Sequence, residues 1–150
     1  LTSLVGSEMC IRDSFISAFG EHVIAKEVEE AIIKAVKDTE ARVTEFTVAP
    51  EITPKKGLPY HEWLIEFEAA PKDLEAFAKS IDLELQKQNS YYSDLIKGKV
   101  LQSLKISLIK TGGFKHYMKT IGKFGGQNKT PRLSNDRKIA SHMHFNNFIK

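Results

Sequence analysis

The sequence predicts an α+β domain, a ferredoxin-like sandwich with a basic loop and helix added at its C-terminal end. Between residues 15 and 109, stretches with strand alternation and stretches with helical period follow one another as β-α-β-β-α-β. Over 150 residues, 41% are hydrophobic and 27% are charged, which is ordinary for one globular domain. Glycine, proline and positive charge gather after residue 109, where the alternation of elements ends.

The first strand and helix are separated by Gly20. Residues 15–19 alternate weakly, which predicts a short strand. Residues 26–41 have the period of an amphipathic helix, with charged side chains left for water. The apolar stripe of this helix consists of Val28, Ala31, Ile32, Ala35 and Val36.

The next two strands are predicted at residues 42–50 and 61–68. The stretch 50–60, which contains three prolines and a glycine, predicts the loop between them. The first should place one face toward the core through Thr44, Phe46 and Val48. The second alternates most clearly, and we expect it to be half-buried. Its core face would consist of Trp63, Ile65 and Phe67, and its other face of Glu62, Leu64, Glu66 and Glu68.

The remaining elements are a helix at 71–88, a short helix or turn at 90–99 and a strand at 104–109. Residues 114–123 and 135–143 then predict two short helices. The stretch 122–135, which contains three glycines and a proline, predicts the loop between them.

Charge is distributed unevenly along the chain. Residues 15–96 contain 9 Lys/Arg and 16 Asp/Glu, whereas residues 97–138 contain 11 Lys/Arg and one acid, Asp136. This excess predicts that the last third faces an anion, which could be nucleotide phosphate, nucleic acid or an acidic partner domain. A solvated basic face explains the charge excess equally well.

Other classes of protein find little support. No apolar run approaches the roughly 20 residues that cross a bilayer, and the first residues do not resemble a secretory signal. One cysteine, Cys10, cannot form an internal disulfide, and no Cys/His cluster has the spacing of a metal site. A cytoplasmic location is therefore expected. Acyl-enzyme chemistry is not indicated either, because no G-x-S-x-G motif is present.

The segment 110–138 is the strongest candidate for a binding site. Glycines allow backbone N–H groups to approach phosphate oxygens, and lysine adds a mobile positive charge. Lys123, Lys129 and Arg132 lie around a glycine pair. The segment is not a Walker A loop, because it lacks G-x-x-x-x-G-K-[ST]. A flexible basic connector is the alternative interpretation.

Three stretches carry a resemblance to a known family: AFGEHVIAKEVEEAI, YHEWLIEFE and GGQNKTPRLSNDRK. Over residues 15–140 the chain resembles the C-terminal domain of the Gretchen Hagen family of auxin-responsive acyl-acid amido synthetases, and its bacterial members most closely. These enzymes belong to the adenylate-forming superfamily. The first stretch is also similar to the G-x-x-[VI]-x-x-x-E-V-E start of the small C-terminal domain across that superfamily.

The resemblance implies a function. The complete enzyme would use ATP and Mg²⁺ to adenylate a carboxylic acid and would then conjugate the acyl group to an amino acid. The small domain would act as a lid on the N-terminal domain. Lys129 matches the catalytic lysine of the family's loop and would face phosphate or the acyl carboxylate. Lys123, Gln127 and Arg132 would support the loop or contact phosphate.

The resemblance leaves both ends of the chain unmatched. The N-terminal adenylate-forming domain, which would hold most of the ATP and Mg²⁺ contacts, is not in this sequence, so we expect the chain to be inactive alone. Residues 8–14 resemble a translated transposon mosaic end, so residues 1–14 are predicted to be disordered sequencing adaptor. Residues 141–150 are predicted to be a tail whose His142 and His144 are not metal ligands.

A small basic RNA- or nucleic-acid-binding module is the alternative function, because a ferredoxin-like sheet can serve as an RNA platform. The strands lack the aromatic-rich motif of such modules, which weighs against it. No membrane partner is expected.

Overall fold

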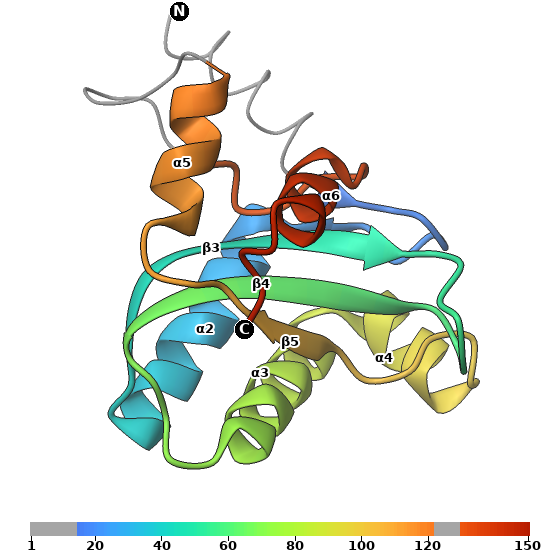
Figure 1. Ribbon diagram of the computed structural model, residues 1–150. Coiled ribbons are helices and arrows are strands. Elements are labelled where there is room, and N and C mark those ends of the chain that lie inside the picture. Colours follow the sequence, from blue (N-terminus) through green and yellow to red (C-terminus); the bar gives the residue numbers. More distant parts are fainter. Residues whose placement is uncertain (1–14, 122–129) are drawn as a thin grey trace, which may run out of the picture.

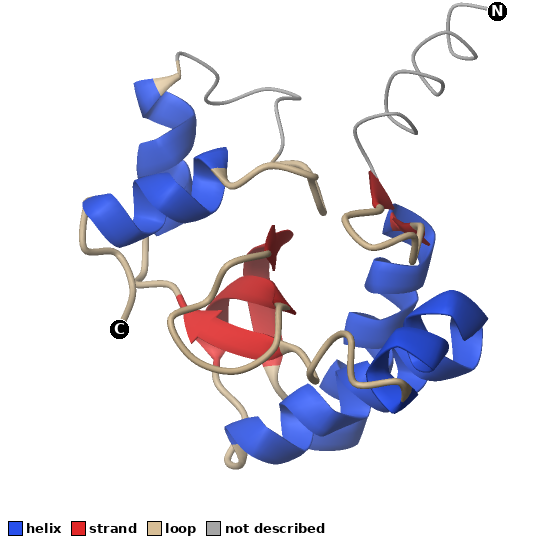
Figure 2. Cartoon of the chain, turned by 90° about the vertical axis from the view of Figure 1, so that its right-hand side faces the viewer, coloured by secondary structure: helices blue, strands red, loops and turns tan. Residues whose placement is uncertain are grey.

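The computed structural model describes residues 15–121 and 130–150. Their centre is a three-stranded sheet in the order β3-β4-β5, in which β3 and β4 are antiparallel and β5 runs parallel to β4. Figures 1 and 2 show helices on both sides of this sheet. The strands of the sheet are β3 (Arg42–Glu51), β4 (Tyr60–Ala69) and β5 (Lys105–Leu108). The helices are α2 (Ala25–Thr39), α3 (Leu74–Gln88), α4 (Ser90–Lys97), α5 (Gly113–Thr120) and α6 (Lys138–Phe145).

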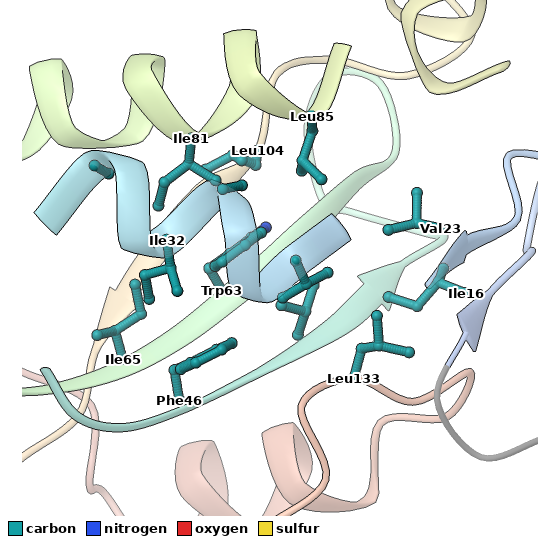
Figure 3. Packing of buried hydrophobic residues seen from close by; sticks show 14 of the residues in the cluster. Ile16, Val23, Ile32, Phe46, Trp63, Ile65, Ile81, Leu85, Leu104 and Leu133 are labelled. Atoms are coloured by element: carbon teal, nitrogen blue, oxygen red, sulfur yellow. The ribbon is translucent and has the colours of Figure 1, made fainter. Parts of the chain in front are cut away.

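The main hydrophobic core lies between the sheet and the pair α2 and α3 (Figure 3). Trp63 is fully buried in it and stacks on Phe46, with ring centroids 5.9 Å apart. The predicted stripe of the first helix is confirmed, since α2 buries Val28, Ala31, Ile32 and Ala35. No helix within residues 15–121 or 130–150 is long and apolar enough to cross a membrane.

The predicted α+β class is confirmed, and the ferredoxin-like order holds only roughly. The first strand does not join the main sheet. Instead β1 (Phe15–Ile16) forms a separate two-stranded sheet with β2 (Val23–Ile24), and Ile16 pairs with Val23. Because β1 lies outside the main sheet, this sheet has three strands rather than four. The strand that pairs in parallel with β4 is β5.

An irregularity in β3 changes the face that one predicted core residue occupies. The pairing with β4 shifts between Arg42 and Val43, and again between Val43 and Glu45. Such a bulge offsets the alternation of side chains, because one strand carries a residue without an opposite partner. Thr44 is consequently exposed, and Val43 packs against the core instead, so the prediction for Thr44 was wrong.

Both faces of β4 are buried, whereas only one was expected to be. The second face is covered by a smaller cluster that α5 and α6 complete, as the arrangement of these helices in Figure 1 shows. Glu62 and Glu66, which we expected on a solvent face, are buried beneath it. The members of this cluster are Ala49, Leu64, Ile109, Phe114, Ile139, Ala140 and Met143.

The segment predicted to be a tail, residues 141–150, packs into the domain. Met143 of α6 is fully buried. Beyond α6 the chain returns along β5: the N–H of Lys110 donates to the carbonyl of Phe148 at 2.7 Å, and Ile109 forms an antiparallel bridge with Ile149. The folded unit therefore extends past residue 140. Residues 1–14, predicted to be adaptor, lie outside the described residues.

Candidate functional site

Only part of the predicted site belongs to the described structure. Lys123, Gln127 and Lys129 lie outside the described residues, and Arg132 lies within them. The described chain resumes at Thr130, whose relative exposure is 4%. The geometry of residues 130–134 therefore defines how the C-terminal end of this segment is fixed.

Residues 130–134 lie along the outer edge of β3. The hydroxyl of Thr47 donates to the carbonyl of Pro131 at 2.7 Å. The N–H of Val48 donates to the carbonyl of Arg132 at 2.9 Å, and its carbonyl accepts from the N–H of Ser134 at 3.0 Å. These bonds occupy backbone groups that an edge strand would otherwise leave unpaired. Leu133, fully buried in the main core, fixes the segment from its other side (Figure 3).

The side chain of Arg132 binds two carboxylates. Its guanidinium donates to Glu45 of β3, and its Nε lies 3.3 Å from Glu29 of α2. The same group lies over the ring of Phe46, 4.8 Å from the ring centroid, in a cation–π contact. Both carboxylates belong to the protein. The two roles predicted for Arg132, support of the loop and contact with phosphate, stay predictions.

A buried carboxylate, that of Glu66, lies at the start of α5, the helix near the N-terminal end of the basic segment. Glu66 is 6% exposed, and its carboxylate accepts from the N–H groups of Gly112 at 3.3 Å and Phe114 at 3.5 Å. A carboxylate is favoured there because the first N–H groups of a helix have no partner within the helix. Gly112 has φ 87°, a left-handed conformation that glycine adopts without strain.

Glu62 joins the sheet to the C-terminal helix. Its carboxylate accepts hydrogen bonds from Ser107 Oγ at 2.5 Å, from Arg137 at 2.7 Å and from His144 Nε2 at 2.9 Å. Arg137 also lies 3.4 Å from Glu51. Burial alone would raise the pKa of Glu62, but the hydrogen bonds from Ser107, Arg137 and His144 outweigh it and lower the pKa. Glu62 is therefore a charged anchor for α6.

The AFGEHV stretch is joined to the YHEWLIEFE strand by a buried pair that the sequence did not predict. Glu21 and His61 are almost completely buried, with Glu21 Oε2 and His61 Nε2 2.7 Å apart. Burial would raise the pKa of Glu21, but the bonds from His61 and from the N–H of Phe19 lower it. The ring of Tyr92 lies beside His61, and its hydroxyl donates to Asp82 at 2.5 Å. Because every member is buried, this network holds the fold together and does not form an open site.

The described residues do not assemble a metal centre. Within 15–121 and 130–150, no group of three His, Cys, Asp or Glu side chains could hold a metal ion. His116 Nδ1 and His142 Nε2 lie 3.4 Å apart, and burial and the neighbouring His116 lower the pKa of His142. His144, rather than trailing in a tail, is bound to Glu62.

Comparison with known proteins identifies the domain. A family model for the GH3 family C-terminal domain matches residues 26–138. A solved GH3.15 acyl acid amido synthetase is 16% identical with a TM-score of 0.72, and the match covers 92% of this chain and 27% of that one. An AtGH3.15 acyl acid amido synthetase in complex with 2,4-DB is 14% identical with a TM-score of 0.69, and the match covers 91% of this chain and 26% of that one. No curated protein matches the chain.

The solved structures show that the fold is shared, and the chain spans only about a quarter of their length. The family model extends from the first turn of α2 to the first residue of α6, so it includes the β3 edge, the buried acids of β4 and the basic segment. This protein chain belongs to the GH3 family, through a GH3 family C-terminal domain.

Proposed function

We propose that this domain is the lid of an ATP-dependent acyl-acid amido synthetase and acts together with an N-terminal adenylate-forming domain. The observation that carries the proposal is the family match, which spans residues 26–138 and includes the glycine-rich QNKTPR segment. The structure adds support because it fixes the end of that segment, residues 130–134, on the edge of β3. The similar solved structures are named acyl acid amido synthetases.

In this proposal Lys129 provides the charge that acts on the substrate. Adenylation releases pyrophosphate, and a preorganised ammonium stabilises the negative charge that grows on the leaving group. Thr130, the residue that follows Lys129 in the sequence, is buried. ATP and Mg²⁺ would be held mainly by the N-terminal domain.

The test is ATP–pyrophosphate exchange and amide formation by the complete enzyme, assayed with a panel of carboxylic acids and amino acids. We expect Lys129→Ala to lower the adenylation rate at least about a hundredfold, a typical loss when one charge-stabilising group is removed from an active site. Lys79→Ala, a change of an exposed lysine on α3 outside the basic segment, is the matched control and should keep the parental rate.

Two outcomes would contradict the proposal. One is pyrophosphate exchange by residues 15–150 alone, since the lid should lack the site that binds ATP. The other is a parental adenylation rate in Lys129→Ala.

The structure weighs against the alternative of an RNA-binding platform. Such modules stack bases on an open sheet face, and here β4 is covered on both faces. A salt series of gel shifts with single-stranded RNA distinguishes the two functions. Binding that is specific and persists at physiological salt would favour the RNA module.

A further inference from the structure

We propose that His116 of α5 and His142 of α6 form a binding site for Zn²⁺ that links these two helices, which together cover the second face of β4 (Figure 1). The site has two protein ligands and is completed by water. It therefore differs from the centres of three or more ligands that the described residues lack. The proposal reverses the prediction that His142 is not a metal ligand, and it is independent of the proposed function.

The first argument is the way in which the two imidazole rings face each other. His116 Nδ1 and His142 Nε2 are 3.4 Å apart, whereas the centroids of the two rings are 5.5 Å apart. The two nitrogens therefore lie between the rings and point toward each other. A bound metal ion requires this arrangement, in which two ligand nitrogens are directed at a common position.

The second argument is the distance between the two nitrogens. Zn–N bonds of about 2.0–2.1 Å that meet at the tetrahedral angle place two ligand nitrogens about 3.3–3.4 Å apart. The separation of 3.4 Å between His116 Nδ1 and His142 Nε2 agrees with this value. A typical protein hydrogen bond donated by an N–H group is shorter, about 2.7–3.2 Å. The spacing thus suits a zinc ion between the rings better than a direct bond from one ring to the other.

The third argument is that neighbouring aromatic rings hold both imidazoles in place. The ring of Phe148 lies against His116, with centroids 4.9 Å apart, and stacks on His142 at 6.4 Å. Tyr117 meets the ring of His142 edge-on at 5.1 Å. Phe148 is itself fixed, since its N–H donates to the carbonyl of Met143 at 2.9 Å. Side chains that are already restrained lose little conformational freedom when a ligand binds.

The fourth argument is the chemistry of the ligands. A metal ion binds histidine in its neutral form, and burial and the neighbouring His116 lower the pKa of His142, which favours that form. Imidazole nitrogen is a good ligand for Zn²⁺, whereas Mg²⁺ prefers oxygen ligands. Because His116 is exposed and His142 is half-buried, water can reach the remaining coordination positions.

Asn146 provides a partner for the other nitrogen of His142. When Nε2 binds the metal, the ring proton lies on Nδ1, which is 3.4 Å from the amide nitrogen of Asn146. Rotation of this amide presents its oxygen to the Nδ1–H group, in exchange for its bond to the carbonyl of His142 at 2.9 Å. Metal-bound histidines commonly donate their second ring N–H to such an acceptor.

Isothermal titration of the 150-residue chain with ZnCl₂ tests the site. We expect saturable binding that His116→Asn and His142→Asn each weaken at least about tenfold, since loss of a mere second-shell partner already costs that much. MgCl₂ should not bind there. The matched control is His22→Asn. His22 is an exposed histidine between β1 and β2 with φ 47°, a conformation that asparagine adopts readily, so this variant should keep the parental affinity for Zn²⁺.

The ¹⁵N chemical shifts of the histidine rings give a second measurement that needs no substitution. Zn²⁺ should shift Nδ1 of His116 and Nε2 of His142 more than the ring nitrogens of His22 and His144. Because this measurement uses the parental chain, a variant that fails to fold cannot imitate the result. Circular dichroism of each variant checks that the domain remains folded.

Weaker Zn²⁺ binding in both variants, together with the largest shifts at His116 Nδ1 and His142 Nε2, supports the proposal. An unchanged affinity for Zn²⁺ in either His116→Asn or His142→Asn overturns it. Lack of saturable Zn²⁺ binding, or shifts that are largest at other histidines, overturns it as well. None of these measurements depends on adenylation, so the proposed function is tested separately.

Discussion

Replacing Glu62 by glutamine tests whether the buried carboxylate anchors the C-terminal helix to the sheet. Glu62 has a relative exposure of 3% and accepts from three donors, which belong to Ser107, Arg137 and His144. Glutamine has nearly the same size, but its amide nitrogen is a donor. At least one of the three donors would then face another donor, and Arg137 would lose its closest counter-charge.

The expected cost can be estimated from the contacts. Breaking a buried ion pair by removing one partner costs about 3–5 kcal/mol. The cost is smaller here because Arg137 is partly exposed and keeps Glu51 at 3.4 Å, and His144 is half exposed. We expect Glu62→Gln to reduce the free energy of unfolding by about 2 kcal/mol. At about 4 °C per kcal/mol, this corresponds to a fall in Tm of about 8 °C.

Urea unfolding, followed by the fluorescence of the single tryptophan, Trp63, measures this loss. Glu68→Gln on the same strand is the control, and it should stay within about 0.5 kcal/mol of the parent because its side chain is exposed. If Glu62→Gln is no more destabilising than Glu68→Gln, Glu62 does not anchor α6.

The loss of stability caused by Glu62→Gln should depend on pH. The pKa of Glu62 is lowered in the folded chain, since its hydrogen bonds outweigh the effect of burial. A lowered folded pKa gives stability that is present above the unfolded pKa and is lost as pH falls through the folded pKa. The stability difference between the parent and Glu62→Gln should therefore be largest above about pH 5 and shrink in more acidic solution. A difference that grows on acidification would refute the reasoning.

Three further substitutions probe other contacts by urea unfolding. Leu133→Ala removes a fully buried side chain and should cost about 2–5 kcal/mol; a cost below 1 kcal/mol would show that the segment is not fixed by the core. Tyr92→Phe takes a buried donor from Asp82 and should cost about 1–3 kcal/mol, with a neutral result arguing against that bond. Gly113→Ala would place a Cβ 2.5 Å from Cγ2 of Ile109, and we expect a loss of about 1–3 kcal/mol from overpacking, which unchanged stability would contradict.

The sequence predicted the elements whose pattern is local. The stripe of α2 and the alternation in β4 recur within a few residues, so a single segment contains the information. The cap of α3, in which Asp73 accepts from the N–H of Ala76 at 3.1 Å, is also local, but we did not predict it and placed the start of this helix at residue 71. Arg132 could be named as a candidate site residue from the sequence alone, because it lies in the QNKTPR stretch that resembles the family's loop.

The features that the sequence did not predict depend on partners that are far away along the chain. Glu62 reads as a solvent residue by alternation, and it is buried because Arg137, 75 positions later, supplies the opposite charge. Glu21 and His61 are 40 positions apart, and neither has a charged neighbour at a spacing that predicts the pair. The bulge at Thr44 likewise depends on pairing with β4 rather than on the residues of β3 alone.

Two segments that pair with the edges of the sheet should affect aggregation of the protein at high concentration. Residues 132–134 pair with β3 at Val48, and the chain around Ile149 pairs with the region just after β5. A three-stranded sheet has two edges, and an uncovered edge can recruit a strand from another molecule. Short segments of the C-terminal third thus pair with part of each edge of the sheet, at Val48 on β3 and at residues 108–110 at the end of β5. We expect deletion of either segment to expose an edge and to favour strand-to-strand aggregation.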